Sequence, residues 1–522
     1  MSVNFESHGG SALGERMQSA LDAFLKASPA LQAHIGTTSD QLFSSFGVDG
    51  SGIYIVESQL RLIEINSGMD SITRVREFFT APGGEFVSTV IPTASFIFAF
   101  GQFDQDSSAS VWRFDKGSLS ERFKDFDNFN GIDLFDAIVH GTGFLLLCSD
   151  SSGTIIFVID SSLALTSRHR YSATTGNLFG SSVVPRPSAS SYIFSAVRTS
   201  TSTVMVYVEV DNASFDVNNA HTLTFSGVSI GLVLKAVLSG DILIVLLSIS
   251  AIPATADTML VAVDISSDAV LWAKRIEGNA VPSFEVQSIS ADGSSVYLVG
   301  RSIQTAAIPN SMMISQLAIA DGSVEKVNFM RSHADVNGIL RQAIVVGSDL
   351  WFAGQQNTEQ QNEITITAFD SATTYNVTIG PTTVSQVGTT DANTTASNLR
   401  TACDASSDPG FAALIWSVLS NVVSATGPNA FVLSASVTGG AGTISNAKVT
   451  NENTFGGQDL QVFKTDSITD NGASITISDI TTPAIATISI TKTTPADTSG
   501  SAVDNTCASV TGYQIAPSTF TI

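Results

Sequence analysis

The residues that most often carry chemistry are sparse in this sequence and stand apart from one another. The six histidines are His8, His34, His140, His169, His221 and His333. No two of them have the spacing of a zinc pair on a helix, and none stands beside a cysteine. His140, in Val139-His140-Gly141-Thr142-Gly143, falls in an expected turn, where a hydrogen-bonded histidine is far more common than a ligand. The histidines therefore predict no metal centre.

The three cysteines, Cys148, Cys403 and Cys507, are too few and too scattered for a zinc site or a disulfide framework. One disulfide bridge fits this count, and free buried thiols fit it better. The sequence contains no phosphate-binding Gly-Lys-Ser/Thr loop. We therefore predict no cofactor.

Carboxylates are the remaining candidates for catalysis. A glycosidase needs two or three of them facing one channel. Asp127, Asp133, Asp136 and Glu285 fall near expected strand ends, but any acidic chain offers such residues. Asp49-Gly50-Ser51-Gly52 resembles part of a calcium loop but lacks the alternating acidic ligands and the closing Glu, which favours a plain turn. The sequence thus predicts no catalytic residue and a protein that is not an enzyme.

Composition and charge limit the class of protein. The chain has 522 residues, of which 43% are hydrophobic, so it is expected to fold. With 47 acidic and 24 basic residues its net charge is −23, which repels nucleic acid and anionic membranes. We predict no specific binding of nucleic acid.

Two segments bear on export and membranes. The first ten residues are polar, contain Glu6, and lack the basic and apolar parts of a secretory signal. The most apolar stretch, 230–252, is interrupted by Lys235, Gly240 and Asp241. It is interpreted as two buried strands rather than a membrane span, so we expect a soluble protein without a membrane anchor.

A repeat of about fifty residues dominates the first two thirds of the chain. A compact apolar strand is followed by a second apolar strand that ends in an Asp or Asn turn. Successive turn residues are 45 to 57 positions apart, and they are Asn66, Asp115, Asp160, Asp211, Asp264, Asp321 and Asp370. Because Asp and Asn side chains accept hydrogen bonds from backbone N–H groups two residues on, these positions are explained without a ligand.

Each repeat can be divided into four strands, most clearly at 232–238, 242–247, 258–263 and 269–276. A small sheet with two apolar faces must stack on its neighbours, and radial closure of the stack protects the sheet edges. The prediction is a mainly β fold with a seven-bladed β-propeller over 41–373. An array of β-sandwiches with fortuitous spacing is the alternative.

One repeat, Leu260–Asp264 followed by Trp272, resembles the repeat of quinoprotein-type propellers, in which a Trp follows the Asp turn by eight residues. The other repeats lack this Trp. The resemblance therefore implies propeller packing and no quinone cofactor.

The flanking segments differ in character from the repeats. Residues 1–40 are predicted to be an N-terminal helical segment, because apolar residues recur at helical spacing in 11–33. This helix either packs on the flank of the propeller or docks on another subunit. Residues 374–456 predict a small α+β module, and residues 457–522 a β-rich C-terminal segment. The C-terminal segment forms either a small β-rich domain or strands that pair with another subunit, and its low charge favours the second.

Within the small module we expect strands at 375–379 and 383–387, helices at 392–402 and 411–419, and a hairpin over 422–435. The strand at 375–379 either closes the seventh blade or opens the module. The order Tyr375-x-Val377-Thr378-Ile379, Ala396 with Leu399, Val423–Thr426 and Phe431–Ala435 resembles a small module that recurs in virion proteins of tailed bacteriophages. The sequence departs from that module in the second helical stretch, around Trp416.

The resemblance implies a structural component of a tailed-phage virion, located in the tail, as in the propeller-bearing nozzle proteins of short-tailed phages. Its expected partners are other virion proteins and further copies of the chain in a ring, with acidic residues lining the lumen so that DNA does not adhere. Contact with the host surface is a further expectation for an outward-facing propeller.

The alternative is a bacterial β-propeller that binds carbohydrate or protein, or that acts as a hydrolase. It would require carboxylates or aromatic side chains that converge in the central channel. Trp112, Trp272 and Trp351 lie in or beside expected strands, which favours core positions over a sugar-binding platform.

Overall fold

The structure is a computed structural model that describes most of the chain between Leu31 and Ile515. The described residues are 31–35, 43–57, 61–69, 71–77, 86–103, 108–118, 120–125, 132–174, 176–198, 204–228, 230–249, 258–276, 283–303, 311–330, 338–357, 360–412, 414–427, 431–450, 458–468, 477–493, 508–511 and 513–515. They form many small antiparallel sheets with little helix, which confirms the predicted mainly β class.

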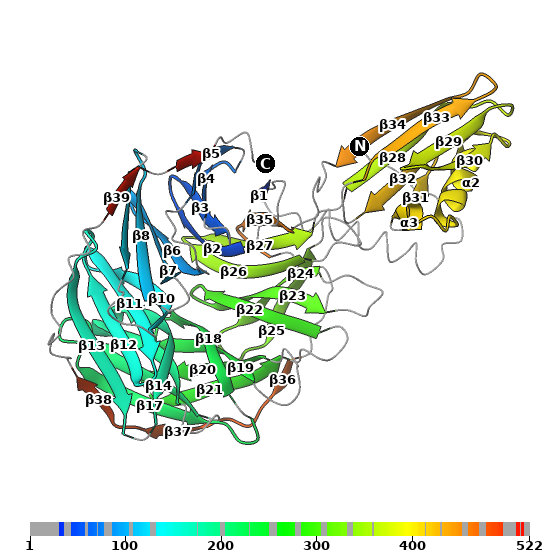
Figure 1. Ribbon diagram of the computed structural model, residues 1–522. Coiled ribbons are helices and arrows are strands. Elements are labelled where there is room, and N and C mark those ends of the chain that lie inside the picture. The colour runs from blue at the N-terminus through cyan, green and yellow to red at the C-terminus, as the bar shows by residue number, and fades with distance from the viewer. Residues whose placement is uncertain are drawn as a thin grey trace.

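Seven of the sheets, here numbered 1 to 7 in chain order, form the body of the protein (Figure 1). Sheet 1 holds β2 (Phe43–Asp49), β3 (Gly52–Glu57), β4 (Arg61–Asn66) and β5 (Ile72–Glu77). Sheet 2 holds β6 (Phe86–Pro92), β7 (Phe96–Phe103), β8 (Ser108–Asp115) and β9 (Ser120–Asp125). Sheet 3 holds β10 (Asp133–His140), β11 (Gly143–Asp150), β12 (Gly153–Ile159) and β13 (Leu165–Ala173).

The next three sheets repeat this order of four hairpin-connected strands. Sheet 4 holds β14 (Leu178–Arg186), β15 (Ser191–Arg198), β16 (Val204–Asp211) and β17 (Val217–Thr224), with the short 3₁₀ turn Pro187–Ala189 between its first two strands. Sheet 5 holds β18 (Ile230–Ser239), β19 (Ile242–Ile249), β20 (Thr258–Asp264) and β21 (Ala269–Ile276). Sheet 6 holds β22 (Ser283–Ala291), β23 (Ser295–Ile303), β24 (Ser311–Ala318) and β25 (Val324–Met330).

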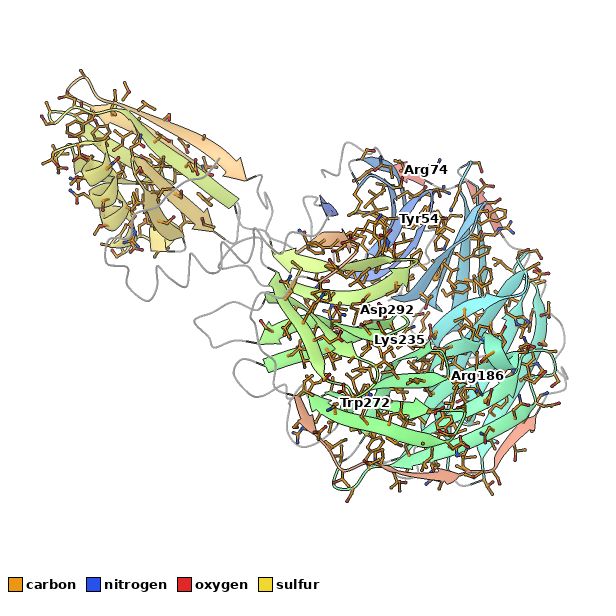
Figure 2. The ribbon with its side chains drawn as sticks, turned by 180° about the vertical axis from the view of Figure 1, so that it is seen from behind. Tyr54, Arg74, Arg186, Lys235, Trp272 and Asp292 are labelled. Atoms are coloured by element: carbon orange, nitrogen blue, oxygen red, sulfur yellow. The ribbon has the colours of Figure 1, made fainter. Side chains whose placement is uncertain are left out.

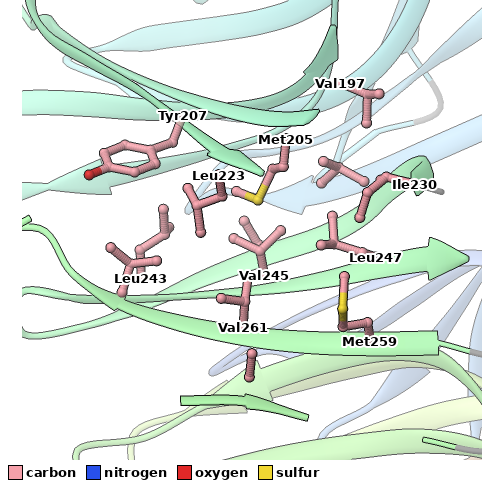
Figure 3. Close-up of a cluster of buried hydrophobic side chains, with 14 of the residues drawn as sticks. Val197, Met205, Tyr207, Leu223, Ile230, Leu243, Val245, Leu247, Met259 and Val261 are labelled. Atoms are coloured by element: carbon pink, nitrogen blue, oxygen red, sulfur yellow. The ribbon is translucent and has the colours of Figure 1, made fainter. Parts of the chain in front are cut away.

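Each sheet packs face to face on the next, and sheet 7 packs on sheet 1 (Figure 1). Seven apolar clusters fill the seven interfaces, so the core is divided into layers between sheets rather than concentrated at one centre. Figure 3 shows the layer between sheets 4 and 5, where Met205 and Leu223 face Val245, Leu247 and Met259. The first strand of each sheet lies on the inner side of the ring and the fourth strand on the outer side.

Every first strand contains a β-bulge at the corresponding position, where its register with the second strand shifts by one residue. The extra residues, called bulge residues below, are Ser44, Ser88, Phe135, Ser181, Leu234, Gln287 and Arg341. A bulge bends its strand and redirects a side chain. The seven repeats therefore agree in a feature that hydrophobic spacing alone does not reveal.

Neighbouring sheets are also joined by a recurring hydrogen bond, called the turn contact here. A donor on the third or fourth strand of one sheet bonds to the turn between the third and fourth strands of the next sheet. Five turn contacts follow one another around the ring: Arg76 Nη2 to Asp115 O at 2.6 Å, Arg113 Nη1 to Ser161 O at 2.7 Å, Tyr171 Oη to Phe215 O at 2.8 Å, Tyr207 Oη to Asp268 Oδ1 at 3.1 Å, and Trp272 Nε1 to Ile319 O at 2.7 Å.

The same turns carry the Asp and Asn residues that the sequence singled out. Asp160 Oδ1 accepts hydrogen bonds from the backbone N–H of Ser162 and of Ala164, and Asp211 Oδ1 accepts from Ala213 and Ser214. Six of the seven predicted residues lie in or beside these turns in sheets 1 to 6. The interpretation of these residues as structural turn residues agrees with this geometry.

Sheet 7 is assembled from three distant parts of the chain. β26 (Gly338–Val346) pairs with β27 (Asp349–Asn357), which pairs with β35 (Gln458–Thr465), which pairs with β1 (Leu31–Ile35). Two predictions are wrong here. The stretch 360–373, assigned to the propeller, does not enter sheet 7, and Leu31 and Ala33, assigned to a helix, lie in a strand. The rest of the predicted helix, 11–30, lies outside the described residues.

The segment between β27 and β35 forms a small domain that extends away from the seven sheets (Figure 1). One sheet has the order β31 (Ile415–Leu419), β32 (Val422–Gly427), β28 (Gln360–Ala368), β34 (Thr443–Thr450), and the other has β30 (Thr382–Val387), β29 (Thr374–Ile379), β33 (Leu433–Thr438). The helices α2 (Ala392–Asp404) and α3 (Pro409–Ala412) complete the domain. The domain has its own apolar cluster. Because β27 and β35, which flank it in the sequence, pair with each other, the domain is an insertion into sheet 7.

Several local predictions for this domain need correction. Asp370 ends no repeat of the ring, because β28 pairs with β32 and β34. Residues 411–419 are not one helix: α3 ends at Ala412, and β31 follows with Trp416 buried. Residues 422–435 are not a hairpin, since β32 and β33 lie in different sheets. The strand at 375–379 opens no new domain and closes no blade; it lies inside the small domain as β29.

The C-terminal segment runs around the outside of the ring as a series of short strands, called the C-terminal belt below. β36 (Ile477–Asp479), β37 (Ala484–Thr487), β38 (Ile490–Thr493), β39 (Ala508–Thr511) and β40 (Tyr513–Ile515) add a fifth strand to sheets 5, 4, 3, 2 and 1, in that order. The expectation that these strands pair with another subunit is wrong for the described residues, because their partners are strands of the same chain.

Some side chains of the C-terminal belt pack against the ring and others are exposed to solvent. Ile485 packs against the core between sheets 4 and 5, and Ile488 against the core between sheets 3 and 4. Ala486 and Thr487 are exposed. We expect Ile485→Asp combined with Ile488→Asp to lower the free energy of unfolding by about 1–3 kcal/mol, because two half-buried apolar side chains become charged. Urea unfolding followed by circular dichroism measures this loss.

The matched control is Ala486→Asp combined with Thr487→Asp, which adds the same charge at exposed positions of the same strand. Its unfolding midpoint should stay close to that of the unmodified chain. Equal destabilisation by the two pairs would contradict the described packing of the belt.

Candidate functional site

The inner strands carry the polar side chains that are candidates for a functional site. Directly after the bulge residue stand Ser45, Thr89, Asp136, Ser182, Lys235, Ser288 and Gln342. Most of these side chains are too short to extend far from the strand, and several bond to the neighbouring sheet. The position is therefore first of all a point of contact between sheets.

Asp136 is the most buried charged group among them, with a side chain 3% exposed. Its Oδ2 accepts hydrogen bonds from Ser182 Oγ at 2.9 Å and from the backbone N–H of Val183 at 3.1 Å, both in sheet 4. Lys235, in sheet 5, lies 3.2 Å from each carboxylate oxygen of Asp136. One carboxylate thus connects three successive sheets, and Figure 2 shows Lys235 on the inner side of the ring.

A hydrogen bond from a backbone N–H of the neighbouring sheet to the side chain that follows the bulge recurs at two other interfaces between sheets. Ser182 Oγ accepts from the backbone N–H of Ala236 at 3.1 Å, and Gln342 Oε1 accepts from that of Phe46 at 3.1 Å. The residue after the bulge therefore accepts from the next sheet through an Asp, a Ser or a Gln. Because these side chains differ in type, the pattern cannot be recognised as a sequence motif.

A second polar group lies between sheets 6 and 7. Glu285 accepts from Arg301 Nε at 2.7 Å and from Gln287 Nε2 at 2.6 Å. Arg341 Nη1 donates to Gln287 Oε1 at 2.8 Å. These four side chains were not grouped by the sequence, in which only Glu285 was noted.

The acids that the sequence placed near strand ends do not form one group in the structure. Asp136 is neutralised by Lys235 and Glu285 by Arg301, and they belong to different sheets. Asp133 accepts a hydrogen bond from Gln102 Nε2 at 3.0 Å. Asp127 lies outside the described residues. A pair of free carboxylates on one site, which glycoside hydrolysis requires, is not formed by Asp133, Asp136 and Glu285.

The described histidines bond to neighbouring side chains. His140 Nδ1 lies 2.6 Å from Tyr192 Oη, and burial lowers the pKa of His140. His169 stacks on Phe215, and burial likewise lowers its pKa. His221 Nε2 lies 3.1 Å from Asp268 Oδ1. The side chains of His8, His34 and His333 lie outside the described part.

The two described cysteines, Cys148 and Cys403, are buried and free. Burial raises the pKa of Cys403 to about 12 and raises that of Cys148 further. A thiol held neutral at ordinary pH is a poor nucleophile. Cys507 lies outside the described residues.

Asp49-Gly50-Ser51-Gly52 forms the tight turn between β2 and β3. Asp49 Oδ1 accepts from the backbone N–H groups of Ser51 and Gly52, and Lys116 pairs with the same carboxylate. The carboxylate is thus used by the turn. Among the residues described, no group of three or more His, Cys, Asp or Glu could hold a metal ion.

The three tryptophans named by the sequence are buried, with Trp112, Trp272 and Trp351 at most 6% exposed. Trp272 packs on the turn of sheet 6, where a Cβ added to Gly322 would lie 2.9 Å from Trp272 Cδ2. Gly322 also has φ +67°, so both its conformation and its contact with the indole require glycine. The resemblance of this repeat to quinoprotein-type propellers thus concerns packing.

No protein-family model matches the chain, and no curated protein matches it. Among solved structures, the computationally designed Ika8 protein is 8% identical, with a TM-score of 0.39 over 61% of this chain and 83% of that one. BamB from Moraxella catarrhalis is 9% identical, with a TM-score of 0.37 over 77% of this chain and 99% of that one. These likenesses are too distant to carry an argument.

In the described ranges, neither α2 nor α3 nor any other helix has the length and apolar character to cross a bilayer.

The Asp136 cluster gives a direct test of its role. Asp136→Ala leaves Ser182, the N–H of Val183 and the ammonium of Lys235 without their acceptor. We expect a loss of about 1–3 kcal/mol in the free energy of unfolding, below the value for a fully buried pair because Lys235 is 38% exposed. Urea unfolding measures it.

Asp133→Ala is the matched control, since Asp133 is on the same strand and has one described hydrogen bond. Asp133→Ala should lower the free energy of unfolding clearly less than Asp136→Ala does. If Asp136→Ala leaves stability unchanged, the carboxylate does not connect the three sheets as described.

Proposed function

We propose that the seven sheets are the blades of a β-propeller and that the chain is a structural component of a tailed-phage virion, located in the tail. By this proposal it assembles with other virion proteins and with further copies of itself. Its contribution is a rigid body that carries a projecting domain, and not a chemical reaction.

The observation that carries the proposal is the closure of the ring by two strands that are far apart in the sequence, β1 and β35. β1 and β35 complete sheet 7, and the C-terminal belt covers the outer edges of five sheets. Exposed sheet edges are sites of unwanted pairing, and covering them suits a protein that is held at high local concentration in an assembly. A ring closed in this way can open only if several strands separate together, which favours mechanical resistance.

The small domain supports the same proposal. It resembles a module of tailed-phage virion proteins, and it is inserted between two adjacent strands of sheet 7, so both of its ends are fixed to the ring. Its exposed apolar side chains include Leu419, 81% exposed, and Val432, 85% exposed. Exposed apolar residues on a projecting domain favour contact with a neighbouring subunit.

The inner strands favour a structural role over sugar binding. Asp136 and Glu285 are paired with cations, and the buried tryptophans present no aromatic platform. The low content of charged residues, 14% of the chain, suits permanent interfaces, where charged groups are depleted.

Immunogold labelling of phage particles with an antibody against the recombinant chain tests the location. We expect gold at the tail, and no gold after the antibody is adsorbed with the recombinant chain. Particles that remain unlabelled, while the chain is recovered only as a free protein, would overturn the virion proposal.

Native mass spectrometry of the purified chain tests assembly separately. The proposal predicts a defined cyclic oligomer, or a complex with a second virion protein. If the chain stays monomeric even when it is mixed with the tail proteins of particles that the antibody labels, the proposed assembly is contradicted. The proposed location in the tail is not affected by that result.

A further inference from the structure

The bulge residues lie on the first strands, which form the inner side of the ring, and one of them differs in charge from the rest. Six of the seven are Ser, Phe, Leu or Gln, and the seventh is Arg341. Its side chain is exposed. Because a bulge redirects its side chain, this position presents a guanidinium group where the other sheets present an uncharged group.

The hydrogen bonds of Arg341 leave most of its donors unused. Nη1 donates to Gln287 Oε1, and the described contacts include no carboxylate partner for Arg341. A guanidinium group has five N–H donors in a planar fork, which matches two oxygens of a carboxylate or phosphate. Among the described residues, Arg341 thus has no carboxylate within ion-pair distance, although the chain has 47 acidic and only 24 basic residues.

A second guanidinium lies close by. Arg301 donates from Nε to Glu285 Oε2, its Nη2 lies 2.6 Å from the same oxygen as an ion pair, and no described contact involves its Nη1. Desolvation lowers the pKa of Arg341; Glu285 opposes this shift and the charge of Arg301 adds to it. Counted over the described side chains of this group, two arginines and one glutamate leave one positive charge without a carboxylate partner.

We propose that Arg301 and Arg341 form a binding site for an oxyanion group, a phosphate or a carboxylate, at the inner strands of sheets 6 and 7. Glu285 holds Arg301 in place through one hydrogen bond and an ion pair, and Gln287 bridges Glu285 to Arg341. An oxyanion between the two guanidinium groups would accept from both and would remove the repulsion between them.

The site does not depend on the proposed virion role. The site requires a ligand whose phosphate or carboxylate group stands on a portion of the molecule that is narrow enough to reach the inner strands of the ring. The strong negative charge of the whole chain disfavours distant anions, so recognition must come from direct contact with the two forks.

Thermal unfolding of the full chain in sodium phosphate or sodium acetate, at an ionic strength matched with sodium chloride, tests the site. We expect a saturable rise in Tm with at least one of the two anions. A stronger effect of phosphate assigns the site to a phosphate-bearing ligand, and a stronger effect of acetate assigns it to a carboxylate.

Arg341→Gln should weaken the apparent affinity about tenfold or more, because charge-assisted hydrogen bonds are lost. Arg341→Lys, which keeps the charge without the fork, should give an intermediate loss. Lys326→Gln makes the same change of charge on β25 of sheet 6 and should leave the response unchanged. The proposal is overturned if neither anion gives a saturable response, or if Arg341→Gln responds like the unmodified chain.

Discussion

The turn contact between neighbouring sheets is the interaction on which the arrangement of the ring most depends. Apolar layers pull two sheets together but are not directional, and they tolerate sliding of one sheet over another. A hydrogen bond from Tyr171 Oη to Phe215 O, or from Trp272 Nε1 to Ile319 O, defines one relative position. Each such bond contributes about 1 kcal/mol, and its larger effect is the cost of leaving a buried donor unpaired.

The chemistry of the turn contact changes from sheet to sheet while its place is kept. Arginine, tyrosine and tryptophan side chains serve as donors in turn, and the acceptor is a backbone carbonyl in four of the five cases. On the inner side, Asp136, Ser182 and Gln342 accept from the next sheet in a comparable way. Each interface is thus fixed at its inner strand, its core layer or its turn, and most interfaces at more than one of them.

One pair of neighbouring strands in the ring is not connected by a hairpin. Sheet 7 contains no turn between its third and fourth strands, because β35 and β1 are far apart in the sequence. Its closure therefore relies on pairing and on apolar contacts such as those of Phe352 with Phe463. The C-terminal belt starts directly after this sheet, and it joins the outer edges of five other sheets. Inserting a domain into sheet 7 is compatible with this closure, because β27 and β35 remain adjacent.

The sequence predicts the strands better than their partners. Apolar alternation and Asp turns locate all four strands of sheet 5 within a few residues, since both signals are local. They do not show that Leu31 pairs with Lys464, or that His221 pairs with Thr487, because pairing over such separations leaves no periodic signal. β28 was assigned to the ring because it follows β27 like the next strand of a hairpin.

The polar groups of the inner strands show the same limit. Lys235 was visible in the sequence only as an interruption of an apolar stretch, and Asp136 only as an acid near a strand end. Their pairing across sheet 4 requires the ring. No sequence pattern indicates the group formed by Arg341, Gln287 and Arg301. Two of these residues, Arg341 and Gln287, stand at bulges, and a bulge is recognised only from the register of two paired strands.

The central claim is that two segments far apart in the sequence, 31–35 and 458–465, close the ring at sheet 7. Hydrogen–deuterium exchange of the intact protein, followed by mass spectrometry, tests it most directly. The account predicts that the amides of 31–35 and 458–465 exchange as slowly as those of 350–357, because all three segments lie in one sheet. Fast exchange in 31–35 and 458–465, with 350–357 protected, would contradict the closure.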